Sequence, residues 1–194
     1  MAETMQALTY FGEGDVRADT RSKPTILEPT DAIIRIDTTV CEAVQNFKPG
    51  DKVLISCVSR GGACENCQNQ LYSHCQNGGS WILGYMIDGT LTEYVRTPFA
   101  DTSLYHLPDT LDKEVAVFLS DALPTGHEIG VQYGEVKPGS DIMIAGAGPV
   151  GMSVLLTPQF YSPATISVVD MDDNRLAKAR EMARRTPSTP RRTT

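Results

Sequence analysis

The sequence predicts a β-rich domain followed by the beginning of an α/β domain, with a boundary near Gly134. Up to about residue 110, short runs of β-branched and aromatic residues are separated by Gly, Pro and Asp, as in strands joined by turns. From residue 136 the pattern alternates strand, helix, strand and helix, which implies a parallel sheet. The expected domains are therefore residues 1–134 and 135–182, followed by a disordered basic tail over 183–194.

Four strands are expected in the first part of the chain, at residues 6–11, 31–40, 51–58 and 91–98. A helix is expected over residues 111–123, because Val115, Leu119 and Leu123 recur on one face. Pro124 should end or kink this helix, since proline has no backbone N–H to donate.

The second part begins with an apolar strand over Ile142–Ala145, and a second strand ends at Asp170. A helix should follow each of them. Pro158 is expected inside the first of these helices, where it would cost about 3 kcal/mol. The tail that follows contains four arginines and no acidic residue, a composition typical of disorder.

Composition and charge exclude several classes of function. The formal net charge of −7 argues against a nucleic-acid partner, because phosphate binding needs a basic surface. The sequence shows neither a signal-peptide pattern nor an apolar run of membrane-spanning length. Three of the five cysteines are clustered, which fits metal ligation in a reducing compartment. We therefore expect a cytoplasmic protein without a membrane partner.

A glycine-rich turn follows the strand that ends at Ala145. In "GAGPVG", Gly146 permits a tight turn, Gly148 lets a pyrophosphate approach the backbone, and Gly151 lets helix and strand pack closely. Asp170 is spaced to bind an adenosine ribose, and a carboxylate there favours NAD over NADP. The alternative is a packing turn without a nucleotide. The candidate cofactor-binding residues are Gly146, Ala147, Gly148, Pro149, Val150, Gly151, Asp170 and Arg175.

The stretch "SRGGACENCQNQLYSHC" contains Cys64, Cys67 and Cys75, spaced as if to surround a metal ion. A structural zinc site usually has four such ligands. The alternative is a redox-active C-x-x-C pair, which would need a thioredoxin-like βαβ context that the surrounding sequence does not provide.

Together with the glycine turn, this cysteine spacing resembles the zinc-dependent alcohol dehydrogenases of the medium-chain dehydrogenase/reductase family. The resemblance covers nearly the whole chain and implies a GroES-like β-barrel followed by a Rossmann domain. It also implies that Cys64, Cys67 and Cys75 bind a structural zinc. A fourth cysteine normally stands where this chain has Gly61, and Cys57 or His74 are the possible substitutes.

The resemblance further implies a catalytic zinc bound by Cys41 and by Asp121 of "LSDALPTG". Without the resemblance, Asp121 would be a helix-end carboxylate and Cys41 a half-buried thiol. The family's Gly-His-Glu segment has no counterpart, because the chain runs from Cys41 directly into "EAVQNFKPGDKV". His127 does not match that motif. We therefore assign no catalytic residue and expect a member that is internally deleted and truncated.

By this resemblance the chain is an NAD- and zinc-dependent oxidoreductase that interconverts alcohols with aldehydes or ketones, with impaired activity. One alternative is a non-catalytic remnant that binds zinc or an adenine nucleotide weakly. Another is a partner-binding β-barrel with a basic tail. The expected partners are a small alcohol or carbonyl substrate and, as often in the family, further copies of the same chain.

Overall fold

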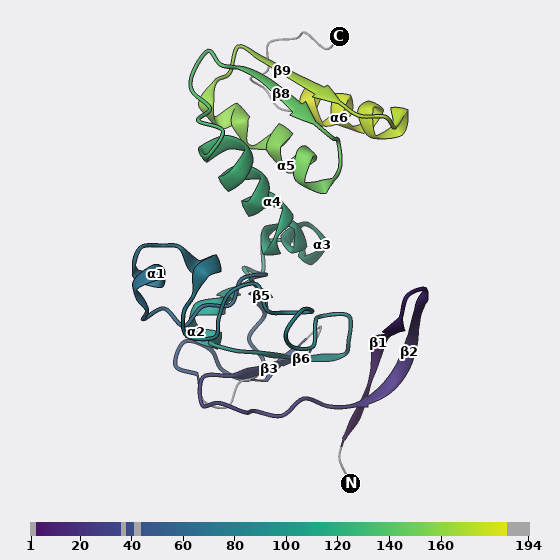
Figure 1. Cartoon of the computed structure of the whole chain (residues 1–194), viewed down its shortest axis with the longest axis vertical. Helices are drawn as coiled ribbons and strands as arrows, with labels where there is room; N and C mark the ends of the chain where they lie inside the picture. The colour runs from purple at the N-terminus through teal and green to yellow at the C-terminus, as the bar shows by residue number, and fades with distance from the viewer. Residues whose placement is uncertain (1–2, 36–37, 41–43, 186–194) are drawn as a thin grey trace. The chain divides into compact units, whose positions relative to one another are not determined.

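The computed structural model describes residues 3–35, 38–40 and 44–185. The chain divides into two compact units, Met1–Ala116 and Val117–Thr194, and each is described by itself (Figure 1). Residues 117–134 make their contacts with the second unit, so this division lies before the predicted boundary near Gly134. The domain limits inferred from the sequence stay predictions.

The first unit begins with an antiparallel hairpin of β1 (Thr4–Gly12) and β2 (Asp15–Ser22). Gly14 lies in the connecting turn at φ 77°, a left-handed conformation that glycine adopts without strain. The strand predicted at residues 6–11 is confirmed within β1. The sequence did not predict β2, because its alternate residues are charged and it contains no apolar run.

Two further small sheets complete the strands of this unit in the described residues. Their order is β4 (Thr38–Val40), β3 (Ala32–Arg35) and β6 (Tyr94–Thr97) in one sheet, and β5 (Val53–Ile55) with β7 (Leu104–His106) in the other. All neighbouring strands are antiparallel. Each remaining predicted run contains a strand, but residues 31–40, expected as one strand, contain the two antiparallel strands β3 and β4. β7 was not predicted. The core consists of the buried residues Ala32, Ile34, Phe47, Val95, Ala100 and Leu104.

Short helices connect these strands and lead into the second unit. They are α1 (Glu65–Gln68), η1 (Tyr72–His74), α2 (Ala100–Ser103), α3 (Lys113–Ala116), η2 (Val117–Ser120), α4 (Ala122–Thr125) and the π-helical η3 (Gly126–Gln132). The predicted helix at residues 111–123 is therefore broken into short pieces, and helical structure continues past Pro124. Proline is tolerated there because it lies in the first turn of α4, where its N–H would have no helical acceptor. Val115 and Leu119 are exposed rather than buried on a shared face.

The second unit contains the predicted strand–helix–strand–helix order. β8 (Asp141–Ala145) pairs in parallel with β9 (Thr165–Val169), and α5 (Pro149–Leu156), η4 (Pro158–Tyr161) and α6 (Asp173–Arg185) follow the strands. Their core contains Ile144, Leu155, Ile166 and Ala179. The expectation for Pro158 was wrong: α5 ends before it, and Pro158 starts η4 instead.

Helix α6 extends to Arg185, beyond the predicted start of the tail at residue 183. Residues 186–194 lie outside the described part of the chain. No helix among the described residues combines the length and the hydrophobicity needed to cross a bilayer.

Candidate functional site

Three cysteine side chains meet in the loop that carries α1 and η1. Cys64 is the residue before α1, Cys67 lies within α1, and Cys75 follows η1. Their Sγ atoms all lie within 4.8 Å of one another. Cys67 is buried, and the other two are half-buried. The fold therefore brings together the three cysteines that the sequence singles out.

Backbone N–H groups surround the cysteine cluster and favour thiolates at two of its members. The N–H groups of Gln76 and of Cys67 lower the pKa of the Cys64 thiol to about 7. Burial, followed by the neighbouring Cys64 thiol, raises the pKa of Cys67. A negative sulfur at Cys64 is thus stabilised before any metal binds, whereas Cys67 must lose its proton to a metal.

The pKa of Cys75 reflects two opposing effects. Burial, the largest effect, raises this pKa, but the N–H groups of Gly61, Asn77 and Gly79 outweigh it, so the pKa is lowered overall. The Gly61 N–H lies 3.4 Å from Cys75 Sγ. Amide donors of this kind stabilise thiolates in the way that hydrogen bonds around a metal stabilise its ligands.

Gly79 is a part of the site that the sequence analysis missed. A Cβ atom at this position would lie 2.6 Å from the carbonyl oxygen of Ser59 and 2.9 Å from Cys75 Sγ. Only glycine leaves room there for both the backbone and the sulfur. The "GG" pair that begins three residues after the third cysteine was the available signal, but its meaning depends on the folded loop.

Gly61 lies where a fourth ligand could approach the cluster. A Cβ atom built there would be 3.8 Å from Cys75 Sγ and no closer than 3.4 Å to any other heavy atom, Asn77 Cβ being the nearest. Neither of the proposed substitutes, Cys57 and His74, belongs to the cluster in the described structure. His74 is exposed, and its Nδ1 lies 3.1 Å from Ser73 Oγ. Among the described residues, the candidate ligands of this cluster are therefore the three thiols.

This donor set fits a zinc ion. Zinc binds cysteine thiolates in tetrahedral sites, and the three clustered sulfurs and the surrounding amides match that requirement. Three thiolates would leave one of the four zinc positions without a protein ligand. Gly61 lies beside the cluster, where a fourth ligand could approach. A zinc ion held here would be structural, because it would hold the loop together.

The glycine turn after β8 has the geometry that its sequence predicts. Gly146 has φ 97°, a left-handed conformation that other residues rarely adopt. A Cβ atom at Gly151 would lie 1.9 Å from the Gly146 carbonyl oxygen, so a side chain there would collide with the turn. Gly148, directly before α5, faces open space, with nothing within 4 Å of a built Cβ. The turn therefore leaves room for a ligand against the first amides of α5.

Asp170 connects the end of β9 to this turn. Its Oδ2 accepts a hydrogen bond from the N–H of Ala147 at 2.6 Å, and its Oδ1 accepts one from the N–H of Asp172 at 2.8 Å. These N–H groups hold the pKa of the Asp170 carboxyl below its ordinary value. Arg175 Nη1 lies 4.0 Å from Oδ2. Because a carboxylate oxygen can accept more than one hydrogen bond, Asp170 could also accept one from a ligand hydroxyl.

Comparison with known proteins identifies the family of this chain. The family model of the alcohol dehydrogenase GroES-like domain matches residues 29–109. The structure of zinc dependent alcohol dehydrogenase 2 from Streptococcus pneumoniae is similar over 92% of this chain, with 42% identity and a TM-score of 0.84. The chain belongs to the zinc-dependent alcohol dehydrogenases of the medium-chain dehydrogenase/reductase family. Its fold class, a GroES-like domain followed by a partial Rossmann domain, is thereby confirmed.

Two curated relatives match a smaller share of the chain. The zinc-type alcohol dehydrogenase-like protein YphC of Escherichia coli K12 is 33% identical over 73% of this chain. The glutathione-independent formaldehyde dehydrogenase of Pseudomonas aeruginosa is 35% identical over 71% of it. The matched regions cover 39% and 37% of these relatives, and 59% of the Streptococcus pneumoniae structure. The chain thus spans less than two thirds of the length of these alcohol dehydrogenase relatives.

The catalytic zinc ligands implied by the alcohol dehydrogenase resemblance are less well supported. Cys41 lies outside the described residues. Asp121 is exposed at the start of α4 and accepts a hydrogen bond from Thr125 Oγ1 at 2.9 Å. Within the described chain, neither Asp121 nor any histidine joins a group of three potential metal ligands. The assignment of Cys41 and Asp121 to a catalytic zinc therefore stays a prediction, and we derive no reaction step from it.

Proposed function

We propose that this chain is an oxidoreductase of the zinc alcohol dehydrogenase family that retains the adenosine-binding half of an NAD site and a three-thiolate structural zinc site. Its family chemistry would be the interconversion of alcohols with aldehydes or ketones. In that chemistry zinc supplies a Lewis acid for the substrate oxygen, and NAD supplies the acceptor of a hydride. We propose that alcohol oxidation is impaired in the 194 residues.

The observation that carries the nucleotide proposal is the Asp170 carboxylate bound to the N–H of Ala147. This hydrogen bond fixes the carboxylate beside the glycine turn, so one ligand could reach the carboxylate and the α5 amides together. An adenosine ribose followed by a pyrophosphate has the matching groups: two hydroxyls for Asp170 and an anion for the helix N-terminus. A 2′-phosphate would be repelled by the carboxylate, and NAD is preferred for that reason.

The impairment rests on the ligands available to a catalytic zinc. Such a site usually has three protein ligands and one open position. The family resemblance provides Cys41 and Asp121, and the sequence between Cys41 and β5 contains no histidine. The alternative function, a non-catalytic protein that binds zinc and an adenine nucleotide, follows from the same residues.

Calorimetry on the purified chain tests the nucleotide proposal. We expect ADP-ribose and NAD to bind with similar affinity, and NADP more weakly. Asp170→Ala should weaken ADP-ribose binding by about tenfold, since it removes hydrogen bonds to both ribose hydroxyls. Lys137→Ala, an exposed substitution in the same unit, is the control. NAD binding far more tightly than ADP-ribose would contradict the proposal.

An NADH absorbance assay over a panel of small alcohols tests the impairment. We expect no zinc-dependent turnover above background. Turnover that disappears in both Cys41→Ser and Asp121→Asn would show instead that these two residues serve a working catalytic site.

A further inference from the structure

The outer edge of β2 has no strand beside it in the described structure. β1 and β2 form a two-stranded sheet, and the other side of β1 is covered by residues 91–93. The charged side chains of β2 are accessible, since Arg17 and Asp15 are 64% and 48% exposed. An edge strand of this kind can pair with another chain.

The hydrogen bonds of β1 determine which backbone groups of β2 face outward. The Leu8 N–H donates to the Leu91 carbonyl, and the Glu93 N–H donates to the Gln6 carbonyl, so the even-numbered residues of β1 face away from β2. The odd-numbered residues of β1 therefore exchange backbone hydrogen bonds with odd-numbered residues of β2, as Ala7 does with Asp19. The N–H and C=O groups of the even-numbered residues of β2 are left to point outward.

Those outward-facing residues are Val16, Ala18 and Thr20. The Thr20 N–H is bonded to Asp19 Oδ1 at 2.8 Å, which agrees with a direction away from β1. Their side chains lie on the face opposite to the charged residues, because side chains alternate along a strand.

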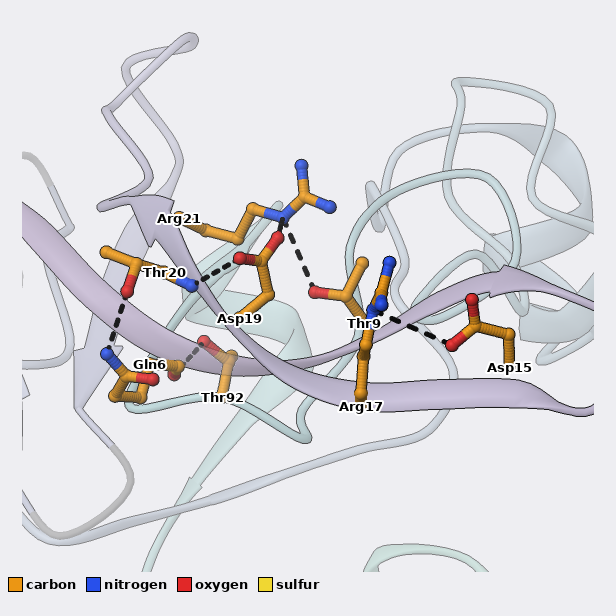
Figure 2. Close-up of polar contacts among 8 residues, drawn as sticks. All are labelled: Gln6, Thr9, Asp15, Arg17, Asp19, Thr20, Arg21 and Thr92. Atoms are coloured by element: carbon orange, nitrogen blue, oxygen red, sulfur yellow. Dashed lines mark hydrogen bonds and ion pairs between the residues drawn. The ribbon is translucent and has the colours of Figure 1, made fainter.

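The charges along β2 alternate in sign, in the order Asp15, Arg17, Asp19, Arg21 (Figure 2). Within one chain they form two ion pairs, Arg17 with Asp15 and Arg21 with Asp19. When the same four residues are written in reverse order beside the first, each acidic residue lies opposite a basic one. If two copies of β2 run antiparallel about a two-fold axis at Ala18, each Arg17 lies opposite Asp19 of the second copy.

In the same register Asp15 lies opposite Arg21 of the second copy. We propose that two copies of this chain associate by pairing their β2 strands antiparallel about Ala18, which joins the two hairpins into one four-stranded sheet. The Ala18 pair exchanges two backbone hydrogen bonds, as do both pairs of Val16 with Thr20. The charged residues occupy the non-hydrogen-bonded positions, where opposing side chains lie closest.

Neighbouring registers are disfavoured by like charges. An axis at Val16 would put Arg17 opposite Asp15 of the second copy but Asp19 opposite Glu13. An axis at Thr20 would put Asp19 opposite Arg21 but Arg17 opposite Lys23, so only the axis at Ala18 pairs all four charged residues with opposite charges. Alternating charges can also keep an edge strand solvated and unpaired. That role alone does not explain why one register pairs every charged residue of β2 with an opposite charge. Each Asp19 must release the Thr20 N–H on pairing, and salt should weaken the association.

Sedimentation velocity of the 194-residue chain over a range of concentrations tests the proposal. We expect a monomer–dimer equilibrium that high salt shifts towards monomer. Arg17→Glu places a glutamate opposite Asp19 at both symmetry-related positions of the dimer, and should weaken the dimer at least about tenfold. Combining Arg17→Glu with Asp19→Arg restores opposite charges in the same register and should restore the dimer. Lys137→Glu makes the same change in net charge in the other unit and should have no effect.

Cross-linking tests the register directly. Ala18→Cys places two thiols across the two-fold axis, at a Cα separation that a disulfide can span. It should give a covalent dimer on mild oxidation, and Thr20→Cys, which faces Val16, should not. A chain that stays monomeric at all concentrations, a dimer indifferent to Arg17→Glu, or equal cross-linking of both cysteine variants would overturn the proposal.

Discussion

A cysteine introduced at Gly61 would stand beside the cluster of Cys64, Cys67 and Cys75. Its Cβ atom has ordinary contacts of 3.4 Å or more and lies 3.8 Å from Cys75 Sγ. We expect Gly61→Cys to raise zinc affinity on the order of tenfold or more, because a fourth thiolate completes the tetrahedron and excludes water. Competition with a chromogenic chelator measures this change. Gly61→Ser is the control, and an unchanged affinity in Gly61→Cys would point to another fourth ligand.

The opposite effect is expected at Gly79. Gly79→Ala would force a methyl group to within 2.9 Å of Cys75 Sγ and 2.6 Å of the Ser59 carbonyl oxygen, so the loop must shift. Because a displaced donor and ligand cost metal affinity, we expect zinc binding to weaken by about 10- to 100-fold. Gly61→Ala, whose methyl group has room, should bind zinc as the wild type does. Equal affinities in the two alanine variants would show that the loop tolerates the methyl group.

The positions of both motifs could be predicted because they depend on residue type and spacing. The cysteine cluster and the Gly146 turn lie where the sequence places them. Gly79 could not be predicted, since its role is to leave space beside a sulfur that only the folded loop brings near. The role of Asp170 as an acceptor for the Ala147 N–H is likewise a property of the folded turn.

At the level of the elements, Asp31, the residue before β3, forms a buried ion pair with Arg96 of β6. Asp31, which is 1% exposed, accepts hydrogen bonds from the Leu27 and Glu28 N–H groups and from Arg96 Nη1 at 3.0 Å. We expect Arg96→Ala to lower the free energy of unfolding by about 3–5 kcal/mol, because it leaves a buried carboxylate without its counter-charge. Urea unfolding measures the loss.

The matched control for this pair is Lys137→Ala. Lys137 and Glu135 form an ion pair that is exposed on both sides, 72% and 78%, and exposed pairs contribute about 0–1 kcal/mol. A loss below about 1 kcal/mol for Arg96→Ala as well would mean that Asp31 is sufficiently satisfied by the two backbone N–H groups.

Elements with an apolar pattern could be predicted, and elements determined by pairing could not. β8 and β9 are apolar runs bounded by turns, and the sequence places both. β2 was missed because its charged residues follow no apolar pattern, and its strand conformation depends on pairing with β1. The helix after residue 111 was predicted as a single element, although it breaks into α, 3-10 and π-helical pieces.

At the scale of the whole molecule, the two compact units correspond to the two kinds of sequence pattern. The first contains the antiparallel strands and the cysteine cluster, and the second contains the parallel pair and the glycine turn. Local patterns therefore predicted the fold class. They did not predict where the units divide. Residues 117–134 belong to the second unit because α4 and η3 pack against α5, and the local sequence pattern does not show this packing.

The number of zinc ions bound per chain tests this division of sites. Among the described residues, only Cys64, Cys67 and Cys75 form a group able to hold a metal. Cys41 and Asp121 would provide two ligands, one fewer than a catalytic zinc usually has. We therefore expect metal analysis of the purified chain to find no more than one tightly bound zinc ion. Cys67→Ser should remove it and Cys41→Ser should not. Two tightly bound ions, one of them lost in Asp121→Asn, would require a further ligand beside Cys41 and Asp121.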